Sequence, residues 1–461
     1  MTYRVMNRRQ FHAAAIAGTA TLTAGAPFVF AAEKKPLMAG AAETVVTPAA
    51  KGTFLIGPMK PSTGVNDDLY ARALVLANGD ERIAIVTLDY LGFDFGFTRV
   101  LLTTASKASG IPTDHIMLNC SHTHSAALTA PWGPWKEHQD KPFHQMLPKK
   151  VAEVVRLACD NLQPARLLYR REPTQIGFNR RLFNGQRIVM APNPQGAVLP
   201  WVDVLAAERK DGKPVAVLFS HAAHPVIVHE ASTLISADYP GFAVQTLKRS
   251  RDKDTIYLFA QGCSGNINGF PLKGGIDAAS AAGRDLGQAV GRALDQMEND
   301  NASGSIRCRS SEIELPLQSP PSAEACREMM RKERRPDRRQ RFADLLAIAE
   351  SGKPRTIRMP IRAFAIGDLC MLGMAHEPFA EYHHFVNEIC PFKHNMTFAY
   401  TNGLECYVGT KNDYDLAENG GYETSPRGAA FMFESRLPLA SECEEQIRAG
   451  LRLVMQAAKK G

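Results

Sequence analysis

The sequence predicts a single large α/β domain, in which mixed β-sheets are flanked by helices and a site lies at the strand ends. Two observations indicate this fold class. Apolar strand segments alternate with helical segments along the chain, and no internal repeat of fixed period or obvious linker follows residue 50. Several apolar strands are also followed directly by polar residues, and α/β sheets commonly gather their sites at such strand ends.

The composition is that of an ordinary globular enzyme and argues against nucleic acid as a main partner. Of the 461 residues, 45% are apolar and 22% are charged. The formal net charge is only +7, and no platform of interleaved aromatic and basic residues is evident. The nine cysteines contain no CxxC pair, so no structural zinc ribbon is expected.

Residues 1–31 are predicted to be a twin-arginine export signal. Arg8-Arg9 precede an Ala/Thr-rich apolar run, and small residues suited to cleavage stand near Ala31. An N-terminal anchor helix is disfavoured, because the run is short and is broken by glycine and proline. We therefore expect an exported protein, periplasmic or secreted, without stable membrane insertion. Residues 32–50 are expected to form a tail, followed by a catalytic domain over residues 51–461.

Hairpins, helices and further strands account for most of that domain. Three hairpins are predicted over residues 70–89, 202–220 and 356–374, from paired apolar segments around turn sequences such as Asn78-Gly79. Helices are predicted over residues 97–109, 146–162, 240–250, 276–298, 321–350 and 440–459, and further strands over 114–118, 165–170, 255–260 and 396–400. The helical segment 321–350 carries many arginines balanced by acids, which favours a solvated face.

A His-x-His pair follows the strand predicted at residues 114–118. Residues i and i+2 of a strand share a face, so His122 and His124 are expected to project together from the strand end. Two imidazoles at that spacing suit a shared metal, or one metal with a neighbouring partner. The pair is a weak motif by itself, because this His content produces His-x-His by chance in many chains.

Other polar clusters have ordinary explanations when each is taken alone. His224-Pro225 could be a core histidine, Glu377 a carboxylate at a helix start, and Tyr407 a packing residue. The order of the clusters carries more information than any one of them. In chain order they are His122-Thr-His124-Ser, Asn179-Arg180, His224-Pro, Ser236-Ala-Asp238, Gly262-Cys-Ser264-Gly-Asn266, Glu377-Pro378 and Asn402-x4-Tyr407.

This series resembles the catalytic domain of the neutral/alkaline (non-lysosomal) ceramidases. That family carries a His-Thr-His-Ser-Gly-Pro motif, an Asn-Arg-Ser segment, and a His fourteen residues before the Asp of a Ser-Asp-Asn segment. Here His224 stands fourteen residues before Asp238. The family's Asp-Val-Ser-Pro-Asn loop corresponds to residues 262–266, and its later Glu and Asn-x-Tyr-x-x-Tyr segments correspond to Glu377 and residues 402–407. The resemblance covers roughly residues 53–461.

The resemblance implies a zinc amidase and assigns its site residues. One Zn²⁺ per chain would be held by His122, His224, Glu377 and Tyr407. Catalytic roles are implied for His124 and Arg180 beside the substrate carbonyl, for Ser264 near the bound amide, and for Tyr422 as a further active-site tyrosine. The substrate would be a small molecule or a lipid, which would place the protein in lipid metabolism.

The implied residues make chemical sense. Two imidazoles and a carboxylate leave a zinc position open for water, and zinc lowers the pKa of that water toward about 7. Arg180 and His124 would stabilise negative charge on a tetrahedral intermediate. A phenol is an unusual zinc ligand, so Tyr407 would either bind the metal as phenolate or donate to the developing oxyanion.

Three functions remain open from the sequence. The first is a zinc-dependent hydrolase that cleaves an amide (N-acyl) bond, as ceramidases do. The second is a metal hydrolase of the same fold acting on a non-lipid substrate, such as a glycan or a polar ester. It is favoured by two departures from the family: Ala126-Ala127 replace Gly-Pro, and the chain ends where ceramidases continue into an immunoglobulin-like domain. The third, a non-catalytic binding protein, is disfavoured because every implied ligand type is retained. A serine hydrolase is disfavoured too, because Ser264 lacks the Gly-x-Ser-x-Gly elbow.

Overall fold

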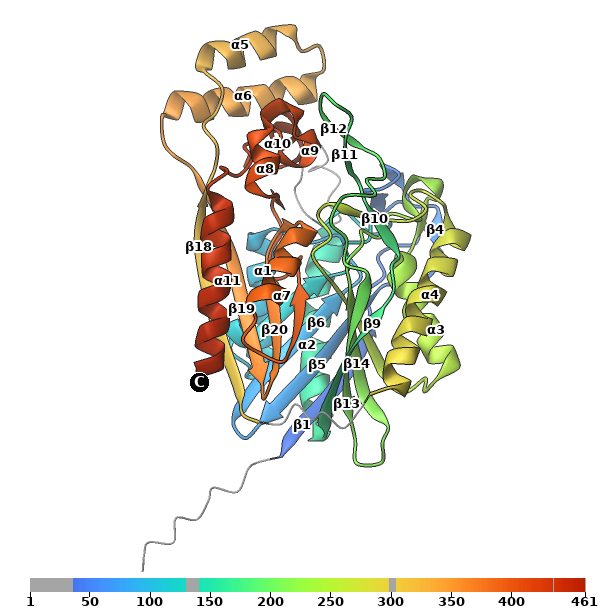
Figure 1. The fold of residues 1–461 in the computed structure, drawn as a ribbon. Helices are drawn as coiled ribbons and strands as arrows, with labels where there is room; N and C mark the ends of the chain where they lie inside the picture. Colours follow the sequence, from blue (N-terminus) through green and yellow to red (C-terminus); the bar gives the residue numbers. More distant parts are fainter. Residues whose placement is uncertain (1–35, 130–140, 298–303, 434, 461) are drawn as a thin grey trace, which may run out of the picture. The chain divides into compact units, whose positions relative to one another are not determined.

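Three β-sheets of four or five strands form the centre of the described chain (Figure 1). The computed structural model describes residues 36–129, 141–297, 304–433 and 435–460, so the predicted export signal lies outside the described residues. The five-stranded sheet has the order β7-β6-β5-β1-β8, formed by Ile116–Cys120, Glu81–Leu88, Tyr70–Asn78, Leu37–Val45 and Gln163–Pro164. The four-stranded sheets are β16-β14-β13-β9 (Ile256–Gln261, Pro214–His221, Trp201–Glu208, Arg166–Pro173) and β18-β19-β20-β22 (Ile306–Pro316, Thr356–Ile366, Leu369–Met374, His394–Phe398).

Short strand pairs and helices complete the fold. The pairs are β2–β3 (Phe54–Leu55, Lys60–Pro61), β4–β15 (Gly64–Val65, Leu234–Ile235), β10–β17 (Gly177–Asn179, Ile267–Gly269), β11–β12 (Arg181–Phe183, Ile188–Met190) and β21–β23 (Glu377–Pro378, Tyr407–Val408). The helices are α1 Phe95–Ser109, α2 Lys141–Asp160, α3 Asp238–Ser250, α4 Ile276–Asp295, α5 Ala323–Lys332, α6 Pro336–Ser351, α7 Ala380–Ile389, α8 Lys411–Asp415, α9 Gly421–Thr424, α10 Pro426–Met432 and α11 Cys443–Lys460.

The inner faces of the three sheets share one apolar core. Leu74 and Ile85 of the five-stranded sheet, Leu218 and Leu258 of the second sheet and Phe364 of the third belong to this one cluster of buried side chains. The outer face of the five-stranded sheet packs against α1 and α2. Helices α3 and α4 cover the second sheet, and α11 covers β18 and β19 (Figure 1). The predicted fold class, a mixed α/β domain with helices flanking the sheets, is confirmed.

The chain forms these elements where local sequence signals place them. The three predicted hairpins are present as β5–β6, β13–β14 and β19–β20. Gly79 supplies the positive φ of 66° that the first turn requires. Helix α1 begins at the N-cap Asp94, whose side chain accepts from the Phe97 amide, and ends at Gly110, which has φ 74°. The predicted helix over residues 321–350 is divided into α5 and α6, because Pro336 starts a new helix.

In each large sheet, one strand at an end of the sheet runs parallel to its neighbour. The C-terminal ends of these three strands lie close together around Asn119. These strands are β7, β16 and β22, which pair in parallel with β6, β14 and β20. The buried Asn119 side chain joins the three ends: its Nδ2 donates to the Ala399 carbonyl at 2.6 Å, and its Oδ1 accepts from the Gln261 amide at 2.8 Å. The loops that follow these strands therefore start beside one another, as the polar residues after the strands predicted.

One expectation about the chain is wrong, and one strand was not predicted. Residues 32–50 were expected to be a tail, but Leu37–Val45 forms β1, which pairs along its length with β5 inside the five-stranded sheet. The strand was not predicted because its sequence is rich in alanine, which does not favour strands, and it lies between β5 and β8 in the sheet. Strand β18 was not expected either, because its polar residues alternate on an edge of the third sheet. Among the helices of the described residues, none combines the length and apolar character needed to cross a bilayer.

Candidate active site

His122 lies just beyond β7, where the backbone turns sharply. Its φ is 69°, a conformation that costs energy for a non-glycine residue and is typical of functional sites. The strand alternation therefore ends before His122, and the expected shared strand face of His122 and His124 is wrong. The imidazole is buried, and its Nδ1 lies 2.6 Å from the Leu91 carbonyl oxygen. Burial lowers the pKa of His122 to about 3, so without a metal the ring is neutral.

His224 comes from the loop after β14, and it is held in the same way. Its side chain is fully buried, and its Nδ1 lies 2.8 Å from the Ser264 carbonyl oxygen. Burial, followed by the charge of Arg180, lowers the pKa of His224 well below its usual value. In both rings Nδ1 is thus engaged as the N–H donor, which leaves the lone pair on Nε2 for another partner.

Glu377 and Tyr407 are direct partners in the parallel strand pair β21–β23. The Gly262–Asn266 turn packs closely on this pair, because a Cβ on Gly265 would lie 2.3 Å from the Glu377 carbonyl oxygen. Glycine is therefore required at residue 265, where the ceramidase motif has proline. The pairing explains how two residues from distant segments reach the same site.

The Glu377 carboxylate meets both histidines. Its Oε2 lies 3.4 Å from His122 Nε2 and 3.2 Å from His224 Nε2. Burial raises the pKa of Glu377 to about 8, and the charge of Arg180 opposes this shift. Three atoms with lone pairs therefore converge at one buried point, and such an arrangement needs a proton or a cation between them.

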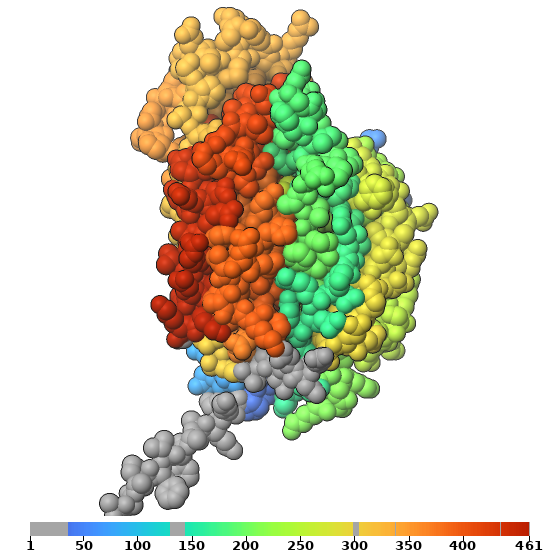
Figure 2. Space-filling model, in the orientation of Figure 1, coloured from blue at the N-terminus to red at the C-terminus, as the bar shows by residue number. Residues whose placement is uncertain are grey.

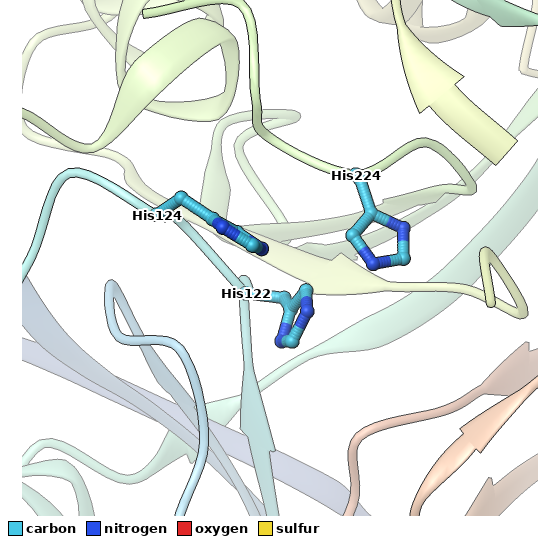
Figure 3. Close-up of side chains that lie close together, drawn as sticks. All are labelled: His122, His124 and His224. Carbon is cyan, nitrogen blue, oxygen red and sulfur yellow. The ribbon is translucent and has the colours of Figure 1, made fainter. Parts of the chain in front are cut away.

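The donor set fits zinc. Ligands placed tetrahedrally at 2.0–2.1 Å from zinc are roughly 3.3 Å from one another, close to the separations of Glu377 from the two histidines. The Nδ1 hydrogen bonds to backbone carbonyls are also the usual support of zinc-binding imidazoles. Figure 3 shows His122, His124 and His224 turned toward a common space, with ring nitrogens within 4.8 Å of one another. This group could hold a metal ion.

His124 lies beside the two other histidines and has a free buried nitrogen. Its ring centroid is 5.1 Å from that of His122 and 5.9 Å from that of His224. Its Nε2 is buried and has no hydrogen-bond partner among the described residues. Burial, then the neighbouring His122, lowers the pKa of His124 well below its usual value. A neutral imidazole with a free nitrogen can ligate a metal or exchange a proton with a substrate.

Arg180 enters the site from the segment between β10 and β11 and is only 3% exposed. Its guanidinium donates to Glu423 Oε1 at 3.1 Å, to Asn268 Oδ1 at 2.8 Å and to the Gly265 carbonyl at 2.8 Å. The same guanidinium carbon lies 5.5 Å from the ring centroids of both Tyr407 and Tyr422. Arg180 is therefore a fixed positive charge beside the Glu377 centre.

The predicted hydroxyl groups are brought to the same site. The Tyr407 and Tyr422 hydroxyls lie 3.4 Å apart. Ser264 Oγ instead contacts the Tyr400 hydroxyl at 2.9 Å, and that hydroxyl is 3.4 Å from Glu377 Oε2. The structure thus brings together all eight residues that the sequence implied.

Sequence reasoning missed two residues that hold this site. Tyr400 has φ 51°, and its ring contacts that of His122 at a tilt of 35° with a centroid distance of 4.4 Å. Its place at the C-terminal end of β22 was the available signal. Glu423 binds both Arg180 and Arg181, and its position directly after Tyr422 could have indicated it.

A cavity of about 1100 Å³ adjoins the site, and Tyr422 forms part of its wall. The wall also includes Met190 from β12, Phe342 and Leu345 from α6, and Phe431 from α10. In Figure 2 these segments adjoin at one end of the visible face: α5–α6 in light orange, residues 421–432 in orange-red, and the β11–β12 hairpin in green. Charged side chains, among them Arg187, Glu333 and Arg427, also line the cavity.

Comparisons with known proteins identify the fold. No family model and no curated protein sequence matches the chain. Among solved structures, the neutral ceramidase from Pseudomonas aeruginosa matches with a TM-score of 0.71 and 19% identity, over 92% of this chain and 74% of that one. A ceramidase complexed with C2 matches with a TM-score of 0.69 and 17% identity, over 92% of this chain and 75% of that one. The chain therefore has the fold of a neutral ceramidase.

Proposed function

We propose that this protein is a zinc-dependent hydrolase of the neutral ceramidase family, which cleaves an amide (N-acyl) bond. The observation that carries the proposal is the convergence of His122 Nε2, His224 Nε2 and Glu377 Oε2 at one buried point of a ceramidase fold. One zinc ion per chain would be held by these three groups and by Tyr407, which is paired with Glu377. When bound, zinc would supply a water of lowered pKa and polarise the scissile carbonyl.

The residues around the proposed zinc site would bind the substrate and transfer protons. Arg180 uses three N–H groups to hold its guanidinium beside Tyr407, where its charge would stabilise a developing oxyanion. His124 Nε2, which is buried and has no hydrogen-bond partner among the described residues, would hold the proton that the leaving amine takes up. Tyr422 would hydrogen-bond the Tyr407 hydroxyl and mark the entrance to the cavity. Ser264 would support the site through the Tyr400 hydroxyl.

The large cavity supports a substrate with a long apolar part. Its lining includes methionine, leucine and phenylalanine side chains, whose burial against an alkyl chain is favourable. A lipid-like N-acyl substrate would place its alkyl chain there and its amide between Arg180 and His124. The alternative, a glycan or a polar ester, finds support only in the charged residues that line part of the same cavity.

A substrate series on purified protein tests this proposal. We expect amides of one amine with acyl chains of increasing length to be cleaved with rising kcat/KM until the cavity is filled. Chelation should abolish cleavage, and added zinc should restore it. Cleavage of acetylated sugars or short polar esters, without cleavage of N-acyl amides, would establish the alternative.

We also infer that Arg8 and Arg9 direct export of the folded protein.

A further inference from the structure

Arg181 follows Arg180 directly and begins the short strand β11. Its side chain is buried, and its guanidinium carbon lies over the Phe379 ring at 4.9 Å from the centroid. The ceramidase motif has serine at this position of its Asn-Arg-Ser segment, so the resemblance implies no role for Arg181. Arginine is rarely buried unless it is paired, and the partners of Arg181 indicate what it does.

Two carboxylates and a backbone carbonyl hold the Arg181 guanidinium. Its Nη1 donates to Glu423 Oε2 at 2.7 Å, and its Nη2 donates to Asp413 Oδ1 at 2.9 Å and to the Gly420 carbonyl at 2.7 Å. Gly421 packs against this ion pair, because a Cβ there would lie 3.2 Å from Arg181 Nη1 and 3.1 Å from Glu423 Oε2. The guanidinium is therefore fixed in one orientation against α8 and α9.

The Glu423 carboxylate is shared between two arginines. Its Oε1 accepts from Arg180 Nε at 3.1 Å, and its Oε2 accepts from Arg181. The side chains of all three residues are at most 5% exposed, whereas that of Asp413 is 19% exposed and nearer to solvent. The buried group thus contains two positive charges and one negative charge. Charges in such a place are weakly screened, so their balance acts on the centre beside Arg180.

This balance would change if Arg181 had no charge. Glu423 would then have Arg180 as its only cationic partner among the described residues. The two charges would cancel where the Arg180 guanidinium lies 5.5 Å from the rings of Tyr407 and Tyr422. An oxyanion that develops there would lose the net positive charge that stabilises it. Binding of the substrate itself would change less, because an amide is uncharged.

We propose that Arg181 is a positioning residue, which engages one oxygen of Glu423 and so leaves the charge of Arg180 available to an oxyanion. This inference rests on the proposed function, because it needs a reaction that develops negative charge beside Arg180. The charge of Arg181 should therefore matter more than its hydrogen bonds. Removing the charge of Glu423 at the same time should restore what the loss of Arg181 removes.

Paired variants test the inference. Arg181→Met keeps an apolar stem without a charge, and Arg181→Gln can still donate a hydrogen bond to Glu423. We expect either change to lower kcat for an N-lauroyl amide by about tenfold to a hundredfold, with KM changed by less than about threefold. Arg181→Met combined with Glu423→Gln should regain most of that loss, since the carboxylate that opposes Arg180 is gone.

A purely structural role of Arg181 gives a different result. The double variant has one ionic contact fewer than Arg181→Met, so a kcat that stays low or falls further in the double variant overturns the inference. Wild-type kcat in both single variants overturns it too. Should Arg181→Met show no cooperative unfolding transition, Arg181→Gln is combined with Glu423→Gln instead. Arg171→Met should keep the wild-type kcat, because Arg171 lies outside the site between the Asp203 carboxylate and the Trp201 ring.

Binding without turnover separates this inference from the proposed function. Octylphosphonate carries a tetrahedral anion, and octanol has the same alkyl chain without a charge. In calorimetry of protein supplied with one equivalent of zinc, Arg181→Met should bind octylphosphonate about tenfold more weakly than the wild type does, and octanol equally. If the wild type cleaves no N-acyl amide and this difference is still found, the substrate class is wrong and the role of Arg181 stands. Equal weakening for both ligands, or no binding of octylphosphonate by the wild type, overturns the role of Arg181.

Discussion

His224 Nε2 and Glu377 Oε2 lie 3.2 Å apart in the buried centre of the molecule, although 153 residues separate them in sequence. His224 Nδ1 is already engaged by backbone carbonyls, so Nε2 is the ring nitrogen left to face the carboxylate. His122 Nε2 approaches the same carboxylate oxygen from a third segment. A proton would satisfy this arrangement in the metal-free protein, and the proposed zinc would satisfy it better, because one ion could bind all three atoms.

In the metal-free protein the contribution of Glu377 to stability should fall as the pH rises. Burial raises the pKa of Glu377 from 4.5 to about 8, so the folded state holds a proton that the unfolded state releases. The stabilising contribution is complete below about pH 4.5 and is lost as the pH approaches about 8. The stability of chelated wild-type protein relative to chelated Glu377→Gln, measured by urea unfolding, should decline over this range, since the buried histidines, whose pKa values are lowered, are present in both. With zinc present the trend should reverse, because binding requires the ionised carboxylate. A pH profile that zinc leaves unchanged would contradict the ligand role of Glu377.

Alanine variants of the two histidines in the His-x-His pair should differ in zinc content. His122→Ala should lose zinc and activity together, because His122 Nε2 faces Glu377 at 3.4 Å. His124→Ala should keep most of its zinc and lose turnover by about 10²–10³-fold, as expected for one catalytic hydrogen-bonding group. Metal content and hydrolysis are measured on the same preparations. If His124→Ala empties the site as fully as His122→Ala, then His124 is a ligand, as the mutual approach of the three imidazoles also allows.

Local patterns predicted the hairpins, the helices and the approach of the site segments, since turn sequences and apolar periodicity act over short stretches. They predicted correctly that His122 and His124 meet beyond strand β7, but not how. His122 lies outside β7 with φ 69°, and contacts with Tyr90 and Leu91 from another strand end hold it there. Strand β1 escaped notice because its alanines show apolar character only when buried between β5 and β8.

The role of the arginine-rich segment was only partly visible in the sequence. Residues 321–350 were expected to be a solvated face, and most of their arginines are exposed or paired with acids. Met329, Phe342 and Leu345 of the same segment line the large cavity together with distant residues such as Tyr422. No local pattern distinguishes such side chains from those of an ordinary helix pair, because the cavity exists only through tertiary packing.

Arg180 should be needed as a guanidinium and not merely as a positive charge. Its three hydrogen bonds to Glu423, Asn268 and Gly265 use a planar group that lysine cannot reproduce. Arg180→Lys should therefore lower kcat by about 10²–10³-fold with zinc content unchanged. Arg171→Lys, which changes an arginine paired with the buried Asp203 outside the site, serves as the matched control. Equal activities of the two variants would remove Arg180 from the catalytic group.

Export should depend on the N-terminal arginine pair. Replacing Arg8 and Arg9 together by lysine keeps the charge but removes the twin-arginine motif. We expect an uncleaved precursor to accumulate in the cytoplasm, which fractionation and N-terminal sequencing would detect. Normal export of this variant, with cleavage near Ala31, would indicate the general secretory route instead.

Titration of chelated protein with zinc tests the central claim most directly. Chelated protein is supplied with zinc in substoichiometric steps, and the rate of fatty-acid release from an N-acyl amide is recorded at each step. We expect no release without metal, a linear increase, and a plateau at about one equivalent per chain, because the four proposed ligands define one site. Full activity in protein from which zinc has been removed, or no activity at any zinc concentration, would contradict the account.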